Sequence, residues 1–373
     1  MALSLMEGNE AIARGAVAAG CRFFAGYPIT PATTILNHML AMLPPLGGTC
    51  IQGEDEIASI GLCLGASMAG LKVMTATSGP GISLYSEQIS FAIGSEIPIV
   101  IVDIQRLGPS TGSATRGADG DLQFLQWGSS GGLPVIVLAP SDVKDCYNLT
   151  AHAFNLAEQY RSPVFIASNK EIAMTRESLG IDELMAPEPV ARAAPLPGRP
   201  FLPFQTFEGE MVPPFLPLGG RTLVRQTSST HGPDGYITTD PAEITRMLRR
   251  VQSKIDAAAD RLAIIEHHPI AGADTLILAY GVSSRAAAAA AAELERRGRP
   301  AALLIVKTLW PVPAAAIRRA AEGLRRILVV EMNLGQYVRE IERVLPGQSI
   351  GFCGQMDGRL ITPETIVEAV IHG

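Results

Sequence analysis

Short apolar segments alternate with helix-like segments through the first half of the chain, and this alternation restricts the possible folds most. Apolar runs such as LKVMTATS (71–78) and PIVIVDIQR (98–106) have strand length. Between such runs lie segments with helical spacing, such as PATTILNHMLAML (31–43). Strands that are apolar throughout and alternate with helices form parallel sheets covered on both faces. Residues 1–185 are therefore predicted to form a doubly wound α/β domain.

Composition changes after about residue 185. Residues 186–262 begin as a proline-rich stretch without periodicity, which predicts an extended connector over the surface or a partner, and end in a charged amphipathic helix. Strands and helices alternate again in residues 263–373, where PAALLIVKTLWPVP (300–313) is interpreted as one strand with a proline exit. We expect a second, smaller doubly wound α/β domain there.

Charge and composition exclude several classes of protein. The formal net charge is −6, which argues against nucleic acid as the main partner. The sequence shows no signal peptide at MALSLMEGNE and no apolar run long enough for a membrane span. Five scattered cysteines without a CxxC pair favour buried thiols in a reducing cytoplasm over disulfides or metal ligands. We therefore expect a cytoplasmic protein without a metal site of its own.

The turn GYPITP (26–31) places Thr30 and Pro31 directly before a helix-like run. Thr is a good N-cap and Pro is favoured at the first helical position, so Thr30 is predicted to cap the helix. The exposed backbone N–H groups of such a helix start can attract an anion. Spacing alone favours the purely structural cap.

Glu56 begins EIASIGLCLGASMAG, a helical segment in which almost no other residue is polar. Carboxylates favour helix starts for structural reasons alone. A carboxyl group on the apolar face of that helix would instead be largely removed from water, which is typical of a group that exchanges protons. The residues leave both interpretations open. The Gly-rich turn TSGPG (77–81) joins the next strand to a helix, as a ligand-binding loop or as a tight turn demanded by packing.

A long polar loop follows the strand PIVIVDI, and Arg106 is its first charged residue. Open α/β sheets bind ligands at the carboxyl ends of their strands, and a guanidinium there suits a carboxylate. A surface-paired arginine is the alternative. Arg116, Asp119 and Asp121 could equally serve only to solvate the loop.

The segments GYPITP, GEDEIASIGLCLGASMAG, TATSGPGISLYSEQ and VDIQRLGPSTG occur in one order. Together they resemble the α subunit of 2-oxoacid:ferredoxin oxidoreductases, which use thiamine diphosphate to oxidise 2-oxoacids to acyl-CoA. The resemblance covers essentially the whole chain. It implies a pyrimidine-binding domain over residues 1–185, a connector and helix over 186–262, and a transketolase C-terminal-like domain over 263–373.

The resemblance also implies roles for individual residues. The glutamate that activates the cofactor falls on Glu56, and the contacts to the substrate carboxylate fall on Thr30 and Arg106. The cofactor-binding positions are Tyr27, Pro28, Ile29, Glu56, Ser78 and Gly79. After STG the chain departs from the family, because SATRGADGDL replaces a lysine-containing segment and leaves the role of residues 113–121 open.

The chain has no GDG…N motif for the diphosphate and its Mg²⁺, so it resembles half of a thiamine site. The resemblance implies a β subunit that carries the diphosphate-binding half, the Mg²⁺ and a [4Fe-4S] cluster. Ferredoxin is the implied electron carrier, CoA the cosubstrate, and a dimer of αβ heterodimers the implied assembly, with no nucleic acid or membrane. We expect 2-oxoglutarate as substrate. Pyruvate, branched-chain or aryl 2-oxoacids, a non-oxidative decarboxylase and a non-catalytic scaffold remain alternatives.

Overall fold

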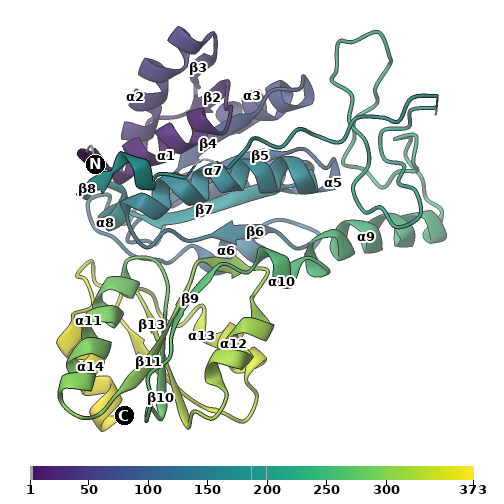
Figure 1. Ribbon diagram of the computed structural model, residues 1–373. Helices are drawn as coiled ribbons and strands as arrows, with labels where there is room; N and C mark the ends of the chain where they lie inside the picture. Colours follow the sequence, from purple (N-terminus) through teal and green to yellow (C-terminus); the bar gives the residue numbers. More distant parts are fainter. Residues whose placement is uncertain (1–2, 186, 199) are drawn as a thin grey trace.

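The computed structural model describes residues 3–185, 187–198 and 200–373, and its core consists of two α/β units stacked one above the other (Figure 1). The first unit contains a seven-stranded sheet with the order β12-β6-β7-β5-β4-β2-β3. Its members are β2 (Phe23–Gly26), β3 (Thr49–Gln52), β4 (Val73–Thr77), β5 (Ile99–Gln105), β6 (Ile136–Leu138), β7 (Pro163–Asn169) and β12 (Thr308–Trp310). All but β12 run parallel. The predicted doubly wound parallel sheet is confirmed.

Helices cover both faces of this sheet, because its central strands are apolar on both sides. Every residue of β4, β5 and β7 is buried. One face packs against α1 (Gly8–Ala18), α2 (Thr33–Met42) and α7 (Val143–Tyr160). The other packs against α3 (Glu56–Met68), α4 (Pro80–Leu84), α5 (Ser86–Gly94) and α6 (Leu122–Trp127). Short elements complete the unit: β1 (Leu3–Glu7) paired with β8 (Arg176–Gly180), α8 (Lys170–Ala173), and the 3₁₀ turns η1 (Pro44–Leu46) and η2 (Ile181–Glu183).

The second unit contains a five-stranded sheet with the order β14-β13-β10-β11-β9. Its strands are β9 (Ile265–His268), β10 (Thr275–Ala279), β11 (Ala301–Val306), β13 (Arg326–Glu331) and β14 (Ser349–Gly354). Helices α11 (Ser283–Arg296) and α14 (Pro363–His372) cover one face, and α12 (Ala314–Ala321) and α13 (Val338–Val344) cover the other. Chain order reverses at β10, since β11 lies on one side of it and β13 on the other. The predicted domain boundaries at 185/186 and 262/263 stay predictions.

The segment 300–313 is not one strand, and that prediction was wrong. It divides at Lys307 into β11, in the five-stranded sheet, and β12, which pairs with β6 and extends the seven-stranded sheet. The reason is the Lys307 side chain, which donates to Asp145 Oδ1 at 2.9 Å and also pairs with Glu266. Because this nearly buried ammonium group needs both partners, its contacts fix the chain where it passes from one sheet to the other.

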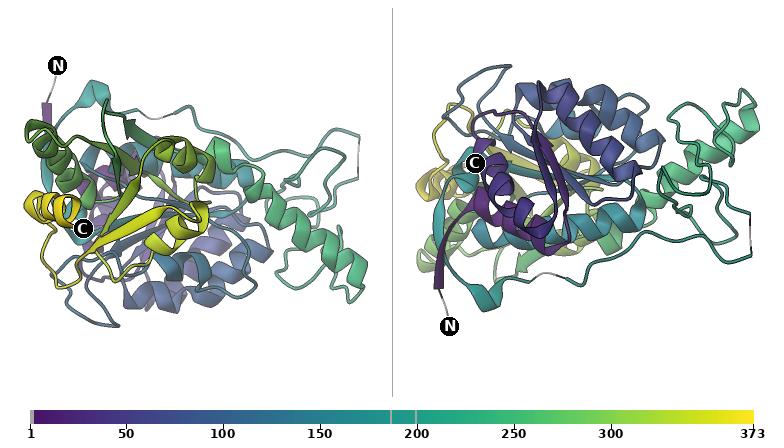
Figure 2. Two further views of the ribbon diagram at one scale, coloured as in Figure 1. Left: turned by 90° about the horizontal axis from the view of Figure 1, so that it is seen from below. Right: turned by 90° about the horizontal axis from the view of Figure 1, so that it is seen from above.

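The connector predicted after residue 185 contains no helix or strand among its described residues 187–198 and 200–240. It extends with α9 (Pro241–Asp256) from one side of the molecule, followed by α10 (Ala259–Leu262), as the two views of Figure 2 show. Asp240 caps α9, because its side chain accepts from the Ala242 and Glu243 N–H groups.

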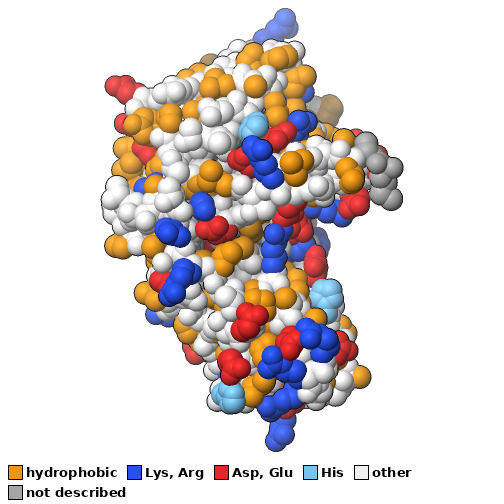
Figure 3. Space-filling view, turned by 90° about the vertical axis from the view of Figure 1, so that its left-hand side faces the viewer, with side chains coloured by type: hydrophobic (Ala, Val, Ile, Leu, Met, Phe, Trp, Pro, Cys, Tyr) orange, Lys and Arg blue, Asp and Glu red, His pale blue; other side chains and the backbone are white. Residues whose placement is uncertain are grey.

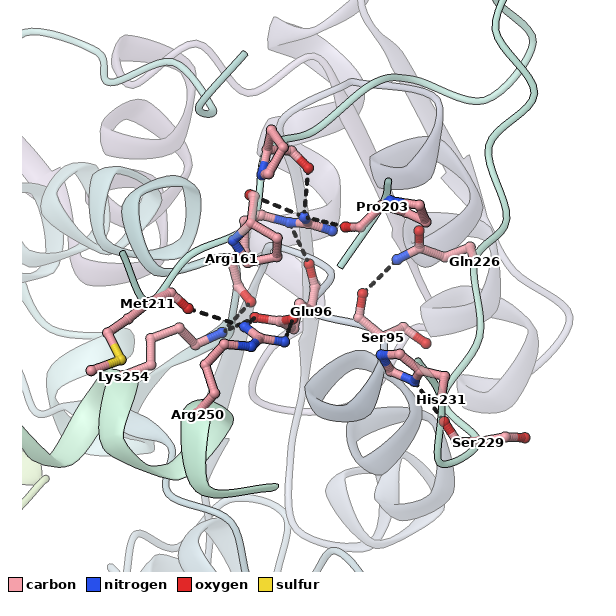
Figure 4. Close-up of polar contacts among 12 residues, drawn as sticks. Ser95, Glu96, Arg161, Pro203, Met211, Gln226, Ser229, His231, Arg250 and Lys254 are labelled. Atoms are coloured by element: carbon pink, nitrogen blue, oxygen red, sulfur yellow. Dashed lines mark hydrogen bonds and ion pairs between the residues drawn. The ribbon is translucent and has the colours of Figure 1, made fainter. Parts of the chain in front are cut away.

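A buried ion cluster attaches α9 to the first unit (Figure 4). Glu96, fully buried after α5, accepts from Lys254 Nζ at 2.8 Å and from both terminal nitrogens of Arg250. Arg161 adds a bond from its Nε to the Glu96 carbonyl and three from its Nη1 to the carbonyls of Pro203, Pro213 and Pro214. Burial alone would raise the pKa of Glu96, but Lys254, Arg250 and Arg161 together hold it well below its usual range. The connector is therefore fixed by charge rather than by secondary structure.

The outer surface has a mixed charge. On the face shown in Figure 3, side chains of both signs are interspersed with hydrophobic ones, and neither sign forms a continuous field. Within the described ranges, none of the helices has the length and apolar character needed to cross a membrane.

Candidate active site

Four loops meet at the carboxyl ends of β3, β2, β4 and β5, which are neighbours in the seven-stranded sheet. These loops carry Glu56, Thr30, the TSGPG turn and Arg106, respectively. The Gly53 N–H donates to the Gly26 carbonyl at 3.0 Å and holds the first two loops together. Because β3 and β4 flank β2 on opposite sides, this edge includes a topological switch point, where doubly wound sheets bind their ligands.

Glu56 is the first residue of α3, and only 8% of it is exposed. The preceding Asp55 caps the helix by accepting from the Ala58 N–H at 2.6 Å. Glu56 therefore does not cap α3, but it is the acidic residue of the first turn, so both interpretations of this carboxylate fit the structure. Its carboxyl group lies against the TSGPG turn and near the buried Tyr85, whose pKa is raised by burial and, among other causes, by the charge of Glu56.

Two glycines shape the TSGPG turn around that carboxyl group. Gly79 has a φ of +36°, which non-glycine residues rarely adopt. A Cβ atom on Gly81 would lie 2.0 Å from Thr77 Oγ1 and 3.0 Å from Glu56 Oε1, so no side chain fits there. The hydroxyl group of Ser78 is buried and has no partner within the described part of the chain. An unpaired buried hydroxyl is costly, and here it points to a bound polar group.

Arg106 is buried, with 6% of its surface exposed, and joins the loops after β2 and β4. Its Nη1 donates to the Thr30 carbonyl at 2.6 Å. Its side chain lies beside Gly79, where a Cβ atom would be 3.7 Å from Arg106 Nε. That Nε is buried and finds no acceptor among the described residues. The guanidinium is thus held in place by one nitrogen while another remains available for an anion.

Thr30 does not cap α2, and that prediction was wrong. Helix α2 begins at Thr33, and its N-cap residue is Ala32. Asn9 Nδ2 donates to the Pro31 carbonyl at 2.9 Å and to Thr34 Oγ1 at 2.7 Å. The Pro31 carbonyl is therefore engaged by a side chain rather than by a first helical turn. The exposed Thr30 remains at the predicted edge, where its carbonyl accepts from Arg106.

The other predicted cofactor-binding residues lie in the same loops. Tyr27 is 39% exposed, and Pro28 and Ile29 are half-buried, in the turn between β2 and Thr30. Ser78 and Gly79 lie between Thr77 and Pro80 in the TSGPG turn. All the predicted site residues therefore follow β2, β3, β4 or β5.

Three carboxyl groups in β5 and the loop after it were missed or misread from the sequence: Asp103 and Asp119 are buried, and Asp121 is partly buried. Burial, and next the charge of Asp121, raise the pKa of the fully buried Asp103 well above its usual value. Burial raises the pKa of Asp119 to about 7 and that of Asp121 to about 6, although Arg106 partly opposes the latter shift. Asp119 and Asp121 therefore do more than solvate the loop, whereas Arg116 is exposed. A lone Asp in the apolar run PIVIVDI was the signal available for Asp103.

Among the described residues, no grouping of side chains indicates metal binding or thiol chemistry. Across residues 3–185, 187–198 and 200–373, no three His, Cys, Asp or Glu side chains are grouped so as to hold a metal ion. All five cysteines are free, and all but Cys50 are buried.

Comparison with known proteins identifies two family models along the chain. Residues 14–250 match the model described as pyruvate flavodoxin/ferredoxin oxidoreductase, thiamine diphosphate-binding. Residues 273–366 match the model described as pyruvate:ferredoxin oxidoreductase core domain II.

Similar proteins match over nearly the whole chain. The 2-oxoglutarate synthase subunit KorA of Methanothermobacter thermautotrophicus is 39% identical over 98% of this chain and 97% of its own length. The solved 2-oxoglutarate:ferredoxin oxidoreductase from Magnetococcus marinus, with 2-oxoglutarate, coenzyme A and succinyl-CoA bound, is 33% identical, with a TM-score of 0.93. The match covers 99% of this chain and 64% of that one. A split-gene transketolase in an inactive β4 tetramer shares the fold, with a TM-score of 0.59 at 14% identity.

Proposed function

Because this chain belongs to the pyruvate flavodoxin/ferredoxin oxidoreductase family, we propose that it is the α subunit of a 2-oxoglutarate:ferredoxin oxidoreductase. The reaction converts 2-oxoglutarate and CoA to succinyl-CoA and CO₂. Two electrons pass to ferredoxin, the thiol proton of CoA is released, and the reaction can also run in reverse. The observation that supports 2-oxoglutarate as the substrate is the 39% identity to a 2-oxoglutarate synthase subunit over 98% of this chain.

The residues of the site fit the aminopyrimidine half of thiamine diphosphate. When bound, this cofactor supplies a nucleophilic carbon for attack on the ketone and accepts the electrons released by decarboxylation. Glu56, buried beside Gly81, holds and exchanges a proton at the ring nitrogen. The turn residues Ser78 and Gly79 bind the cofactor, and the buried hydroxyl of Ser78 supplies a polar contact. Tyr27, Pro28 and Ile29, in the loop after β2, bind it as well.

Arg106 and Thr30 bind the substrate carboxylate that leaves as CO₂. The Thr30 carbonyl holds Nη1, and this contact orients the guanidinium so that its Nε faces the substrate. The exposed Thr30 hydroxyl adds a donor beside it. Burial of Arg106 strengthens its attraction for a carboxylate, because water screens the charge less there. These two residues bind and orient the substrate, and Glu56 handles the proton.

A β subunit completes the enzyme. The matching relative is itself named as a subunit, which supports an assembly of several chains. The partner carries the diphosphate-binding half of the site, Mg²⁺ and a [4Fe-4S] cluster, and ferredoxin collects the electrons. The assembly is a dimer of αβ heterodimers.

Co-expression with the neighbouring partner gene tests this function. The purified complex is assayed with CoA, a viologen acceptor and a panel of 2-oxoglutarate, pyruvate, branched-chain and aryl 2-oxoacids. We expect the highest kcat/KM with 2-oxoglutarate. A higher kcat/KM with another 2-oxoacid would refute 2-oxoglutarate as the substrate. Inactivity toward all of them, with cofactor and clusters present, would refute the function.

A further inference from the structure

The loop that follows Arg106 is tied by hydrogen bonds to the residues on both sides of Arg106. The Leu107 N–H donates to the Arg116 carbonyl at 2.8 Å, and the Ser113 N–H donates to the Leu107 carbonyl at 2.8 Å. On the other side of Arg106, Gln105 Oε1 accepts from the Asp121 N–H at 2.9 Å. Arg106 therefore lies between two residues that the loop holds, so a displacement of the loop moves the guanidinium.

The far end of the loop is bound by the second unit as well as by its own. The Asp119 N–H donates to the Met332 carbonyl at 2.8 Å, and Asn333 Nδ2 donates to the Asp119 carbonyl at 2.9 Å. Gln336 Nε2 donates to the Gly120 carbonyl, and Gln336 Oε1 accepts from the Gln123 N–H at 2.9 Å. Gln123 Nε2 returns a bond to the Gln336 carbonyl at 2.8 Å. Residues 119–123 are thus held by a turn more than 200 positions away in the chain.

This contact lies at the position in the second sheet where doubly wound sheets ordinarily bind a ligand. Asn333 follows β13, and Gly281 follows β10, where the order of strands reverses. A Cβ atom on Gly281 would lie 3.7 Å from Asp119 Oδ2. The loop of the first unit therefore occupies the crevice that doubly wound sheets ordinarily leave for a ligand.

The turn that receives the loop is itself rigid. Asn333 is fully buried, its Oδ1 accepts from the Gly335 and Gln336 N–H groups, and its Nδ2 also donates to the Tyr280 hydroxyl. Tyr280 donates in turn to Glu331 Oε2, which also accepts from the Tyr337 N–H. Such a fully satisfied network resists displacement.

We propose that the second unit positions Arg106 for the substrate carboxylate, with Asn333 and Gln336 as positioning residues that act through the 107–121 loop. This inference rests on the proposed function and assigns a role to residues 113–121, which the sequence left open. The second unit thereby sets the affinity for the 2-oxoacid without touching it.

The test compares Gln336→Ala with Leu334→Ala in the complex with the partner subunit. Gln336→Ala removes the side-chain bonds to Gly120 and Gln123, whereas Leu334 is 77% exposed in the same turn and serves as the control. We expect Gln336→Ala to raise the KM for 2-oxoglutarate about fivefold or more. We expect the KM for CoA and the melting temperature to stay unchanged, and Leu334→Ala to behave as wild type. Gln123→Ala, which removes only its Nε2 bond, should give about a twofold rise.

A double-mutant cycle separates positioning from general damage. In the Arg106→Ala background, Gln336→Ala should change the KM by less than about 1.5-fold, because the residue it positions is gone. An unchanged KM in Gln336→Ala, an equal rise in both backgrounds, or a joint rise of both KM values with a lower melting temperature would overturn the proposal. The wild-type complex must first reduce viologen with a 2-oxoacid, and its failure to do so would count against the proposed function instead.

Discussion

Asp119→Asn should change how the stability of the protein depends on pH. Burial raises the pKa of Asp119 from 3.8 to about 7 in the folded protein, and the charges of Glu331 and Asp121 add to the shift. Its Oδ1 accepts from Asn169 Nδ2 at 2.8 Å, but its Oδ2 is buried and has no partner within the described ranges. A carboxyl group whose pKa is raised stabilises the fold while it is protonated. That contribution is lost between pH 3.8 and about 7.

The size of the effect follows from linkage. Between pH 5 and pH 8 the ionisation of Asp119 should cost the wild type about 2.5 kcal/mol of unfolding free energy. Asparagine does not ionise, so the variant escapes this loss but buries an amide with an unpaired N–H, at about 1–3 kcal/mol at every pH. Asp119→Asn should therefore be less stable than the wild type at pH 5. Its unfolding free energy should rise relative to that of the wild type by about 2–3 kcal/mol between pH 5 and pH 8.

Thermal unfolding of the purified complex at pH 5, 6, 7 and 8 measures this difference. The exposed Asp260→Asn serves as the control and should show the wild-type pH dependence. A shift of the melting temperature by a few degrees in favour of Asp119→Asn across this range is the expected result. Parallel curves for the wild type and Asp119→Asn would refute the reasoning, because they would mean that Asp119 is already ionised throughout.

Three further predictions address the site and the connector. Gly81→Ala should lower kcat at least tenfold by displacing the Glu56 carboxyl group. Gly65→Ala, in α3 with open space around it, should keep full activity, and equal kcat values of the two variants would contradict this account. Thr30→Ala should raise the KM for 2-oxoglutarate several-fold at an unchanged melting temperature, and a loss of stability with an unchanged KM would point to a structural role. Lys254→Met removes a cation from the buried Glu96 and should cost about 3 kcal/mol of unfolding free energy, measured by denaturant titration against the exposed Arg249→Met; equal stability of the two would show that Arg250 and Arg161 suffice.

Much of the first unit follows from local patterns in the sequence. Buried strands such as β4 and β5 lie where apolar runs end at a polar or Gly-containing loop, so the motifs at those ends were placed correctly. Helix α7 was overlooked, although Asp142, whose side chain accepts from the Asp145 N–H at 2.7 Å, is a recognisable cap.

The errors arose where distant contacts override local preference. Thr30 precedes proline, as a capping residue does, but Asn9 engages the Pro31 carbonyl and delays the helix. The strand at 300–313 divides because Lys307 reaches Asp145 in the other unit. Likewise, nothing near residues 107–121 indicates that Gln336 holds them. Sequence periodicity reports burial of one face, and it contains no information on which remote side chain supplies a hydrogen bond.

Proton exchange by Glu56 during 2-oxoacid oxidation is the step on which the proposed function depends most. The most direct measurement is viologen reduction with 2-oxoglutarate and CoA by the Glu56→Gln complex, with cofactor and cluster content matched to the wild type. Glutamine keeps the size of the side chain but cannot ionise, so we predict that kcat falls by about 100-fold or more. Activity equal to that of the wild type would contradict the account.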